Sequence, residues 1–114
     1  MNSIYRATVE VTDYQELELT GPPISVAPCR PSVLGEFDLW YEHMEHDHPL
    51  PAYAQDPHRR YHRRYAIYVF GTGNPTPWNT FTRYAWTFLG TVITHPTAVW
   101  HVYLGPRRGE PIAL

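Results

Sequence analysis

Four arginines and two histidines lie within eight residues, HRRYHRRY, at positions 58–65. Arginine binds phosphate or carboxylate through a planar set of donors, and a neighbouring tyrosine ring can stack on a base. Alternation along an extended chain would place Arg63 and Arg64 on opposite faces, so all four arginines cannot contact one ligand. The candidate partner-binding residues of this segment are Arg59, Arg60, Tyr61, Arg63 and Arg64.

Three roles are open to this basic segment. Its arginines would be partly neutralised by Glu42, Glu45 and Asp47 if the two segments flank a hairpin loop. They could instead bind an acidic surface of another protein. A third role is the binding of a nucleotide or nucleic acid.

A second cluster, EHMEHDH at 42–48, has side chains of the types that bind metal ions. The weak candidate ligands are His43, His46 and His48, with Asp47 beside them. Their spacing on a loop defines no coordination geometry, and no cysteine pair completes it. We therefore expect a solvated loop and no metal or other cofactor.

The stretch YAIYVFGTGNPTPW at 65–78 raises the question of a phosphate-binding loop. It has two glycines, no lysine and no third glycine, and two prolines stand where a helix would have to begin. This pattern predicts a turn in which glycine supplies a positive φ and proline fixes the exit of the chain.

No set of residues predicts catalysis. His101 stands between Trp100 and Val102 in a strand-like run, which indicates a buried, hydrogen-bonded histidine. None of the three serines lies in a G-x-S-x-G motif, and no paired carboxylates suggest hydrolysis. The sequence names no catalytic residue and favours a protein without enzymatic activity.

These residues are carried by short alternating segments, which are typical of half-buried strands. We expect strands at 4–11, 16–19, 24–27, 35–43, 65–70, 84–94 and 98–104, with Gly90 at a bulge or bend. Twelve prolines and the absence of a helical repeat predict an all-β protein. We expect a small antiparallel sandwich or partly open barrel of six to seven strands, as one domain over 1–104. A long charged loop at 43–63 and a C-terminal tail at 105–114 complete it.

Composition narrows the class of protein. The net charge of −2 at pH 7 argues against a domain that as a whole is a nucleic-acid binder, since such domains are commonly basic. Cys29 is the single cysteine, which suits a reducing compartment, and no signal peptide or membrane span is visible. We expect a cytoplasmic protein that does not contact a membrane.

The chain resembles a family of small phage and prophage proteins, DUF7352, a domain of unknown function. The resemblance rests on IYRATVEVTDYQELELTGPPISVA, FDLWYEH, RRYAIYVFGTGNP, YAWTFLGTV and VWHVYL, which together span most of residues 3–104. Two features depart from the family pattern: Asn74 replaces a histidine in the glycine turn, and 43–63 resembles an insertion. The resemblance implies a phage origin and a compact β fold but no activity.

From these features we expect a phage-encoded accessory protein that acts in the host cytoplasm by binding a host protein. The alternatives are binding of a nucleotide or nucleic acid through residues 59–64, and a structural role in the virion or its assembly. A rigid β scaffold with a long charged loop suits recognition, because loops on rigid scaffolds commonly carry binding residues.

Overall fold

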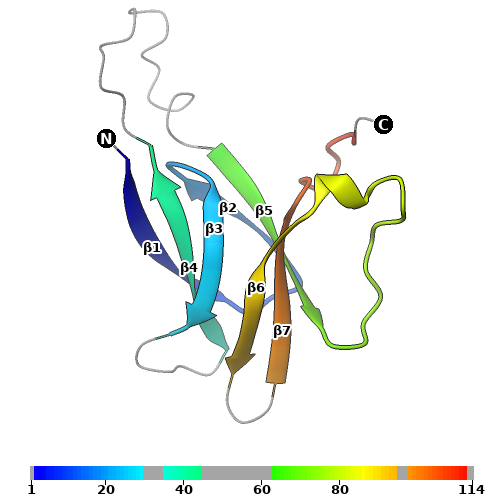
Figure 1. The fold of residues 1–114 in the computed structure, drawn as a ribbon, viewed down its shortest axis with the longest axis horizontal. Coiled ribbons are helices and arrows are strands. Elements are labelled where there is room, and N and C mark those ends of the chain that lie inside the picture. The colour runs from blue at the N-terminus through cyan, green and yellow to red at the C-terminus, as the bar shows by residue number, and fades with distance from the viewer. Residues whose placement is uncertain (1, 30–34, 45–62, 95–97, 113–114) are drawn as a thin grey trace, which may run out of the picture.

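The computed structural model describes residues 2–29, 35–44, 63–94 and 98–112, and these residues form seven strands (Figure 1). The strands are β1 (Ser3–Glu10), β2 (Tyr14–Leu19), β3 (Pro23–Pro28), β4 (Glu36–His43), β5 (Arg63–Gly71), β6 (Thr87–Thr94) and β7 (Ala98–Gly105). The predicted all-β class and the upper strand count are confirmed.

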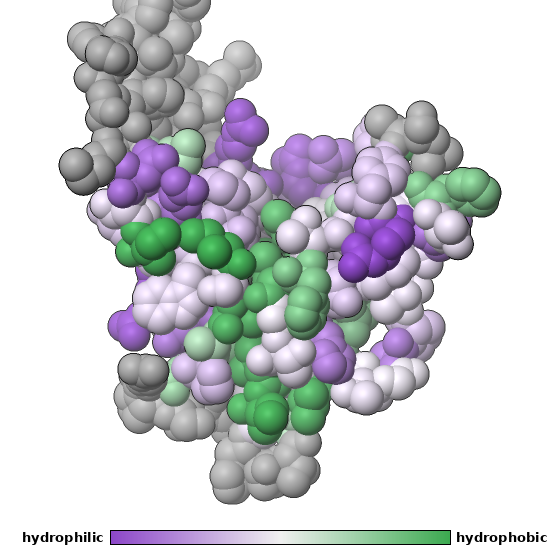
Figure 2. Space-filling view, in the orientation of Figure 1, coloured by the Kyte–Doolittle hydropathy of each residue, from purple (hydrophilic) through white to green (hydrophobic). Residues whose placement is uncertain are grey.

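The strands form two antiparallel sheets. The first has the order β1-β4-β3, and the second has the order β2-β5-β7-β6. Figure 1 shows β3 of the first sheet beside β6 of the second, and the two strands are in close contact. The sheets do not close into a barrel, so the fold is an open sandwich. In the space-filling view of Figure 2, hydrophobic side chains gather in a band where the two sheets meet.

The core lies between the two sheets and follows the predicted alternation. Its centre consists of fully buried aliphatic and aromatic side chains, namely Phe37, Leu39, Ile67, Val92 and Val102. Burying side chains of this size contributes about 1.5–3 kcal/mol each, which makes this layer the main source of stability.

Gly90 brings the two sheets together, as a bulge position predicts. The pairing of β6 with β7 shifts between Phe88 and Gly90, and Gly90 has a φ of +144°. A Cβ atom here would lie 3.0 Å from Cγ2 of Val26 in β3. The missing side chain therefore allows β3 to approach β6 closely.

The alternation in β4 places Asp38 on the outer face of the first sheet, the face away from Phe37 and Leu39, but its side chain is nevertheless buried. Thr8 Oγ1 donates a hydrogen bond to its Oδ1 at 3.3 Å, Cys29 Sγ lies 3.5 Å from the same oxygen, and Arg6 Nη1 lies 3.7 Å from Oδ2. These three partners offset the cost of burying a carboxylate. Burial, followed by the bond and charge of Asp38, raises the pKa of the Cys29 thiol, so this cysteine stays protonated.

Several predicted strand boundaries were wrong by one to three residues, and two of them concern the candidate site. The strand expected at 84–94 begins only at Thr87, because Arg83–Ala85 forms one turn of 3₁₀ helix (η2), closed by the N–H of Trp86 donating to the carbonyl of Arg83. β5 starts at Arg63 rather than at Tyr65, because it pairs along the whole of β2. The rest of the expected 43–63 loop, 45–62, lies outside the described residues.

No helix in the described ranges is long and apolar enough to cross a membrane.

Candidate functional site

The structure describes only part of the predicted binding segment. Arg59, Arg60 and Tyr61 lie outside the described residues, whereas Arg63 and Arg64 are the first two residues of β5 and are exposed. Arg63 is paired with Leu19 and Arg64 with Glu18 in β2. Because directly opposite residues share a face, the two arginines leave the strand on opposite faces, as predicted.

The hairpin on which one of the three roles depended is not formed by the strands that flank the loop. β4, which contains Glu42 of the acidic segment, belongs to the first sheet, whereas β5 belongs to the second. Glu42 accepts a hydrogen bond from Asn2 at 2.9 Å. Glu45 and Asp47 lie outside the described residues, so only Glu42 of the acidic cluster can be placed.

His43 is engaged in packing at the end of β4. Its Nδ1 is 2.6 Å from Thr20 Oγ1, and its ring stacks on Tyr5 with the centroids 4.3 Å apart. The other two candidate ligands, His46 and His48, lie outside the described residues. Among the residues that the structure does describe, no group of three histidine, cysteine or acidic side chains could hold a metal ion.

The glycine stretch forms the predicted turn. The N–H of Asn74 donates to the carbonyl of Gly71 at 3.1 Å, and Gly73 has a φ of +89°. This positive φ at the third position is what a type II turn requires. The turn is linked to β7, because Thr72 Oγ1 lies 2.8 Å from Nε2 of His101.

His101 is hydrogen-bonded at both ring nitrogens, since its Nδ1 lies 3.1 Å from Thr91 Oγ1 in β6. The prediction of a bonded histidine is confirmed, but the prediction of a buried one was wrong. His101 is half-buried on the outer face of the second sheet, the side away from the core. With both nitrogens bonded to hydroxyl groups, the ring has a structural role.

An aromatic cluster covers this outer face. Tyr68 and Phe70 from β5 and Tyr103 from β7 pack with two tryptophans, Trp78 and Trp86, that follow the glycine turn. Trp86 lies directly on Gly105, where a Cβ atom would come within 2.4 Å of its ring. Its buried indole N–H has no hydrogen-bond acceptor among the described residues.

Arg83 holds the segment 72–86 on the cluster. Its guanidinium carbon lies 4.9 Å from the ring centre of Trp78 and 5.7 Å from that of Tyr103, and its Nη1 donates to the carbonyl of Trp86 at 2.7 Å. The same segment leaves two aromatic rings facing solvent, with Phe81 78% and Tyr84 63% exposed. The arrangement is an ordered loop that presents exposed aromatic side chains.

The C-terminal tail packs onto the same face. The Tyr68 hydroxyl donates to the carbonyl of Pro106, and the N–H of Arg108 donates to the Tyr14 hydroxyl at 3.1 Å. The Arg108 guanidinium lies 4.1 Å from the ring centre of Tyr14. Residues 106–112 thus form one wall of the grooves on this face.

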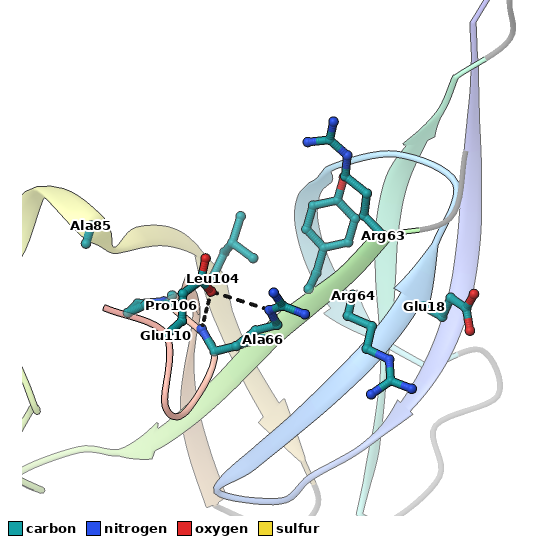
Figure 3. Close-up of a pocket in the computed structure, with 11 residues that line it drawn as sticks. Glu18, Arg63, Arg64, Ala66, Ala85, Leu104, Pro106 and Glu110 are labelled. Atoms are coloured by element: carbon teal, nitrogen blue, oxygen red, sulfur yellow. Dashed lines mark hydrogen bonds and ion pairs between the residues drawn. The ribbon is translucent and has the colours of Figure 1, made fainter. Parts of the chain in front are cut away.

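The arginine groove, about 630 Å³ in volume, lies where β5 begins (Figure 3). Its lining includes three arginines and two glutamates, namely Arg63, Arg64, Arg107, Glu18 and Glu110. Arg107 Nε is 3.4 Å from Glu110 Oε2, so that charge is already paired. Neither Arg63 nor Arg64 forms an ion pair with another described residue, although Arg64 lies directly opposite Glu18 in β2.

A second groove, about 640 Å³, lies on the other side of Arg107 and Glu110. Its floor includes Tyr68, Phe70 and Trp86, and its wall contains Pro75 and Pro77. Partial burial is the main reason that the pKa of Tyr68 is raised, so this hydroxyl stays a donor at neutral pH. The two grooves meet at Arg107 and Glu110, so the arginines of the first lie next to the aromatic side chains of the second.

Sequence reasoning found the arginines but missed the surface to which they belong. The aromatic content is 15%, but nothing in the order of residues places Trp86 on Gly105. One local signal was available: Asn79 Oδ1 accepts hydrogen bonds from the N–H groups of Phe81 and Thr82, at 2.8 and 3.0 Å. Asparagine commonly orders loops in this way, which could have predicted that the exposed loop is fixed.

Comparison with known proteins gives one match. The family model of DUF7352, a domain of unknown function, matches residues 1–112. No curated protein and no solved structure matches the chain.

Proposed function

The chain belongs to the DUF7352 family, a domain of unknown function, and from this premise we propose that it is a small phage-encoded accessory protein that binds a host protein. The observation that carries the proposal is the arginine groove. Arg63 and Arg64 line it at the start of β5, from opposite faces of the strand, and neither forms an ion pair with another described residue.

The groove continues into exposed aromatic surface. Ala85 lines the groove, and the preceding residue, Tyr84, is 63% exposed. Arginine and aromatic side chains contribute most of the binding energy at protein interfaces. These side chains are carried by a β-sheet and by the ordered segment 72–86. They therefore lose less conformational entropy when a partner binds. This combination favours a protein partner with acidic and apolar side chains on adjoining surfaces.

The test is co-purification of tagged protein from host lysate, with bound proteins identified by mass spectrometry. Two variants address the two parts of the surface: the double charge reversal Arg63→Glu with Arg64→Glu, and Tyr84→Ser. Ile93→Ser is the matched control, because Ile93 is 60% exposed but lies near the far end of β6. We expect each surface variant to lose the partner by about tenfold or more, a hot-spot effect, while the control retains it.

Two outcomes would contradict the proposal. Equal recovery with all three variants would remove the groove as the contact surface. A bound nucleic acid whose affinity falls steeply and linearly with the logarithm of salt concentration would favour the nucleotide alternative instead. Repeating the purification at two salt concentrations separates these cases.

A further inference from the structure

Four strands of this fold lie at the edges of sheets: β1 and β3 in the first sheet, and β2 and β6 in the second. An edge strand has a row of unpaired N–H and C=O groups that can pair with another chain. Proteins commonly block such edges with proline, with charged side chains, with bulges or with a covering element.

Three of the four edges carry such features. β3 begins with Pro23 and ends with Pro28, and its pairing is irregular between Pro23 and Ser25. β6 has the bulge before Gly90 and lies against β3. β2 carries Glu16 and Glu18.

β2 also lacks proline and glycine and pairs with β5 in one register, but its two charges, Glu16 and Glu18, have the same sign. β1 differs because its charged side chains, Arg6 and Glu10, are of opposite sign. Its eight residues, SIYRATVE, contain no proline or glycine, and each pairs with β4 in one unshifted register from Ser3 to Glu10. Figure 1 shows β1 at the outside of its sheet, with no strand on its other side. Ile4 is 60% exposed and Tyr5 is 44% exposed. The strand is long, regular and suited to pairing.

We propose that β1 pairs antiparallel with β1 of a second copy of this chain, which joins two three-stranded sheets into one across a two-fold axis. The charges of the strand select the register. With Thr8 at the axis, Arg6 of each copy lies opposite Glu10 of the other, so two opposite-charge pairs form. An axis at Arg6 or at Glu10 sets like charges directly opposite each other, which is unfavourable.

The same register also matches the apolar side chains. It sets Ala7 opposite Val9 on the side of the strand that faces the core, and Tyr5 opposite Val11, the residue that follows β1. Tyr5 is already fixed by its stacking on His43, so little freedom is lost when its exposed ring covers the second copy. The pairing surface is separate from the arginine groove, which lies on the second sheet.

Charge exchange tests the register. The wild-type protein should form a dimer that depends on concentration in sedimentation equilibrium, with the weak affinity expected of a small interface. Arg6→Glu alone and Glu10→Arg alone should each weaken the dimer by about tenfold, because each sets like charges opposite one another. An equimolar mixture of the two variants, and the doubly exchanged variant, should restore it.

Arg6 also contacts Asp38, so a second experiment leaves Arg6 unchanged. Because Thr8 and Cys29 contact Asp38 as well, urea unfolding first checks that each variant is folded. Thr8→Cys in a Cys29→Ala background places a thiol at the axis, and mild oxidation should produce a disulfide-linked dimer. Ile93→Cys in the same background is the control, since Ile93 is exposed and lies on another edge strand. A wild-type protein that stays monomeric at millimolar concentration, a mixture that fails to restore the dimer, or equal cross-linking at both cysteines would overturn the proposal.

Discussion

The hydroxyl of Thr72 lies 2.8 Å from Nε2 of His101 and links the glycine turn to β7. These two residues belong to GTGNP and VWHVY, the two segments on which the family resemblance rested most. The sequence separates them by 29 positions, and the fold brings them together because β5 and β7 are neighbours. The two segments therefore act as one structural unit.

Removal of this hydrogen bond should destabilise the fold modestly. Thr72→Val keeps the shape of the side chain and removes the hydroxyl, which should lower the free energy of unfolding by about 1 kcal/mol. Urea unfolding of Thr72→Val, His101→Phe and the double variant measures the coupling between them. Strictly additive losses would show that the contact contributes nothing.

Gly73 should be sensitive for reasons of backbone conformation alone. Its φ is +89°, and a Cβ atom added there would meet nothing within 4 Å. Gly73→Ala should therefore cost about 1–2 kcal/mol of stability through strain and not through a clash. Gly73→Asn is the control, because asparagine tolerates positive φ better than alanine does. Equal losses in both variants, measured by urea unfolding, would argue against this explanation.

Gly105 should be sensitive for the opposite reason. A Cβ atom there would lie 2.4 Å from the ring of Trp86, so Gly105→Ala must displace the indole. We expect a loss of about 1–3 kcal/mol, as for an overpacked site, and a red shift of tryptophan fluorescence as Trp86 becomes exposed. In a Trp86→Ala background the same substitution should cost almost nothing. A full cost in that background would place the clash elsewhere.

The strands could be predicted because their signal is local. Alternation in residues 4–11 places Val9 inside, and Val9 is buried. The glycine turn was predicted for the same reason, since Gly73 and Pro75 determine backbone angles by their own chemistry. Such features depend on residues a few positions apart.

The candidate site could not be predicted in the same way, because it depends on which strands are neighbours. One role considered from the sequence placed the segments 42–47 and 58–65 on either side of a hairpin loop, but β5 pairs with β2 and β7. That choice of partners places Arg64 opposite Glu18 and brings Arg107 to the same groove. Pairing between distant strands is fixed by the packing of the whole core, which no short stretch encodes.

The burial of Tyr68 makes the stability of the fold depend on pH in the alkaline range. Partial burial is the main cause that raises the pKa of Tyr68 above its ordinary value of 10.0, with the nearby Arg108 acting in the opposite direction. A pKa that is higher in the folded state means that the folded protein holds its proton longer than the unfolded chain. The resulting stability is complete below about pH 10 and is lost as the pH rises through the folded pKa.

Tyr68→Phe should change this dependence in two ways. It removes the hydrogen bond to the carbonyl of Pro106, so stability at pH 7 should fall by about 1 kcal/mol. It also removes the titrating group, so stability should fall less steeply than in the wild type as the pH rises above about 10, the ordinary tyrosine pKa. Tyr65→Phe is the matched comparison. Burial raises the pKa of Tyr65 as well, but the hydrogen bond to Pro106 belongs to Tyr68. Urea unfolding at several pH values measures both effects, and a Tyr68→Phe curve parallel to the wild type above pH 10 would contradict the assignment.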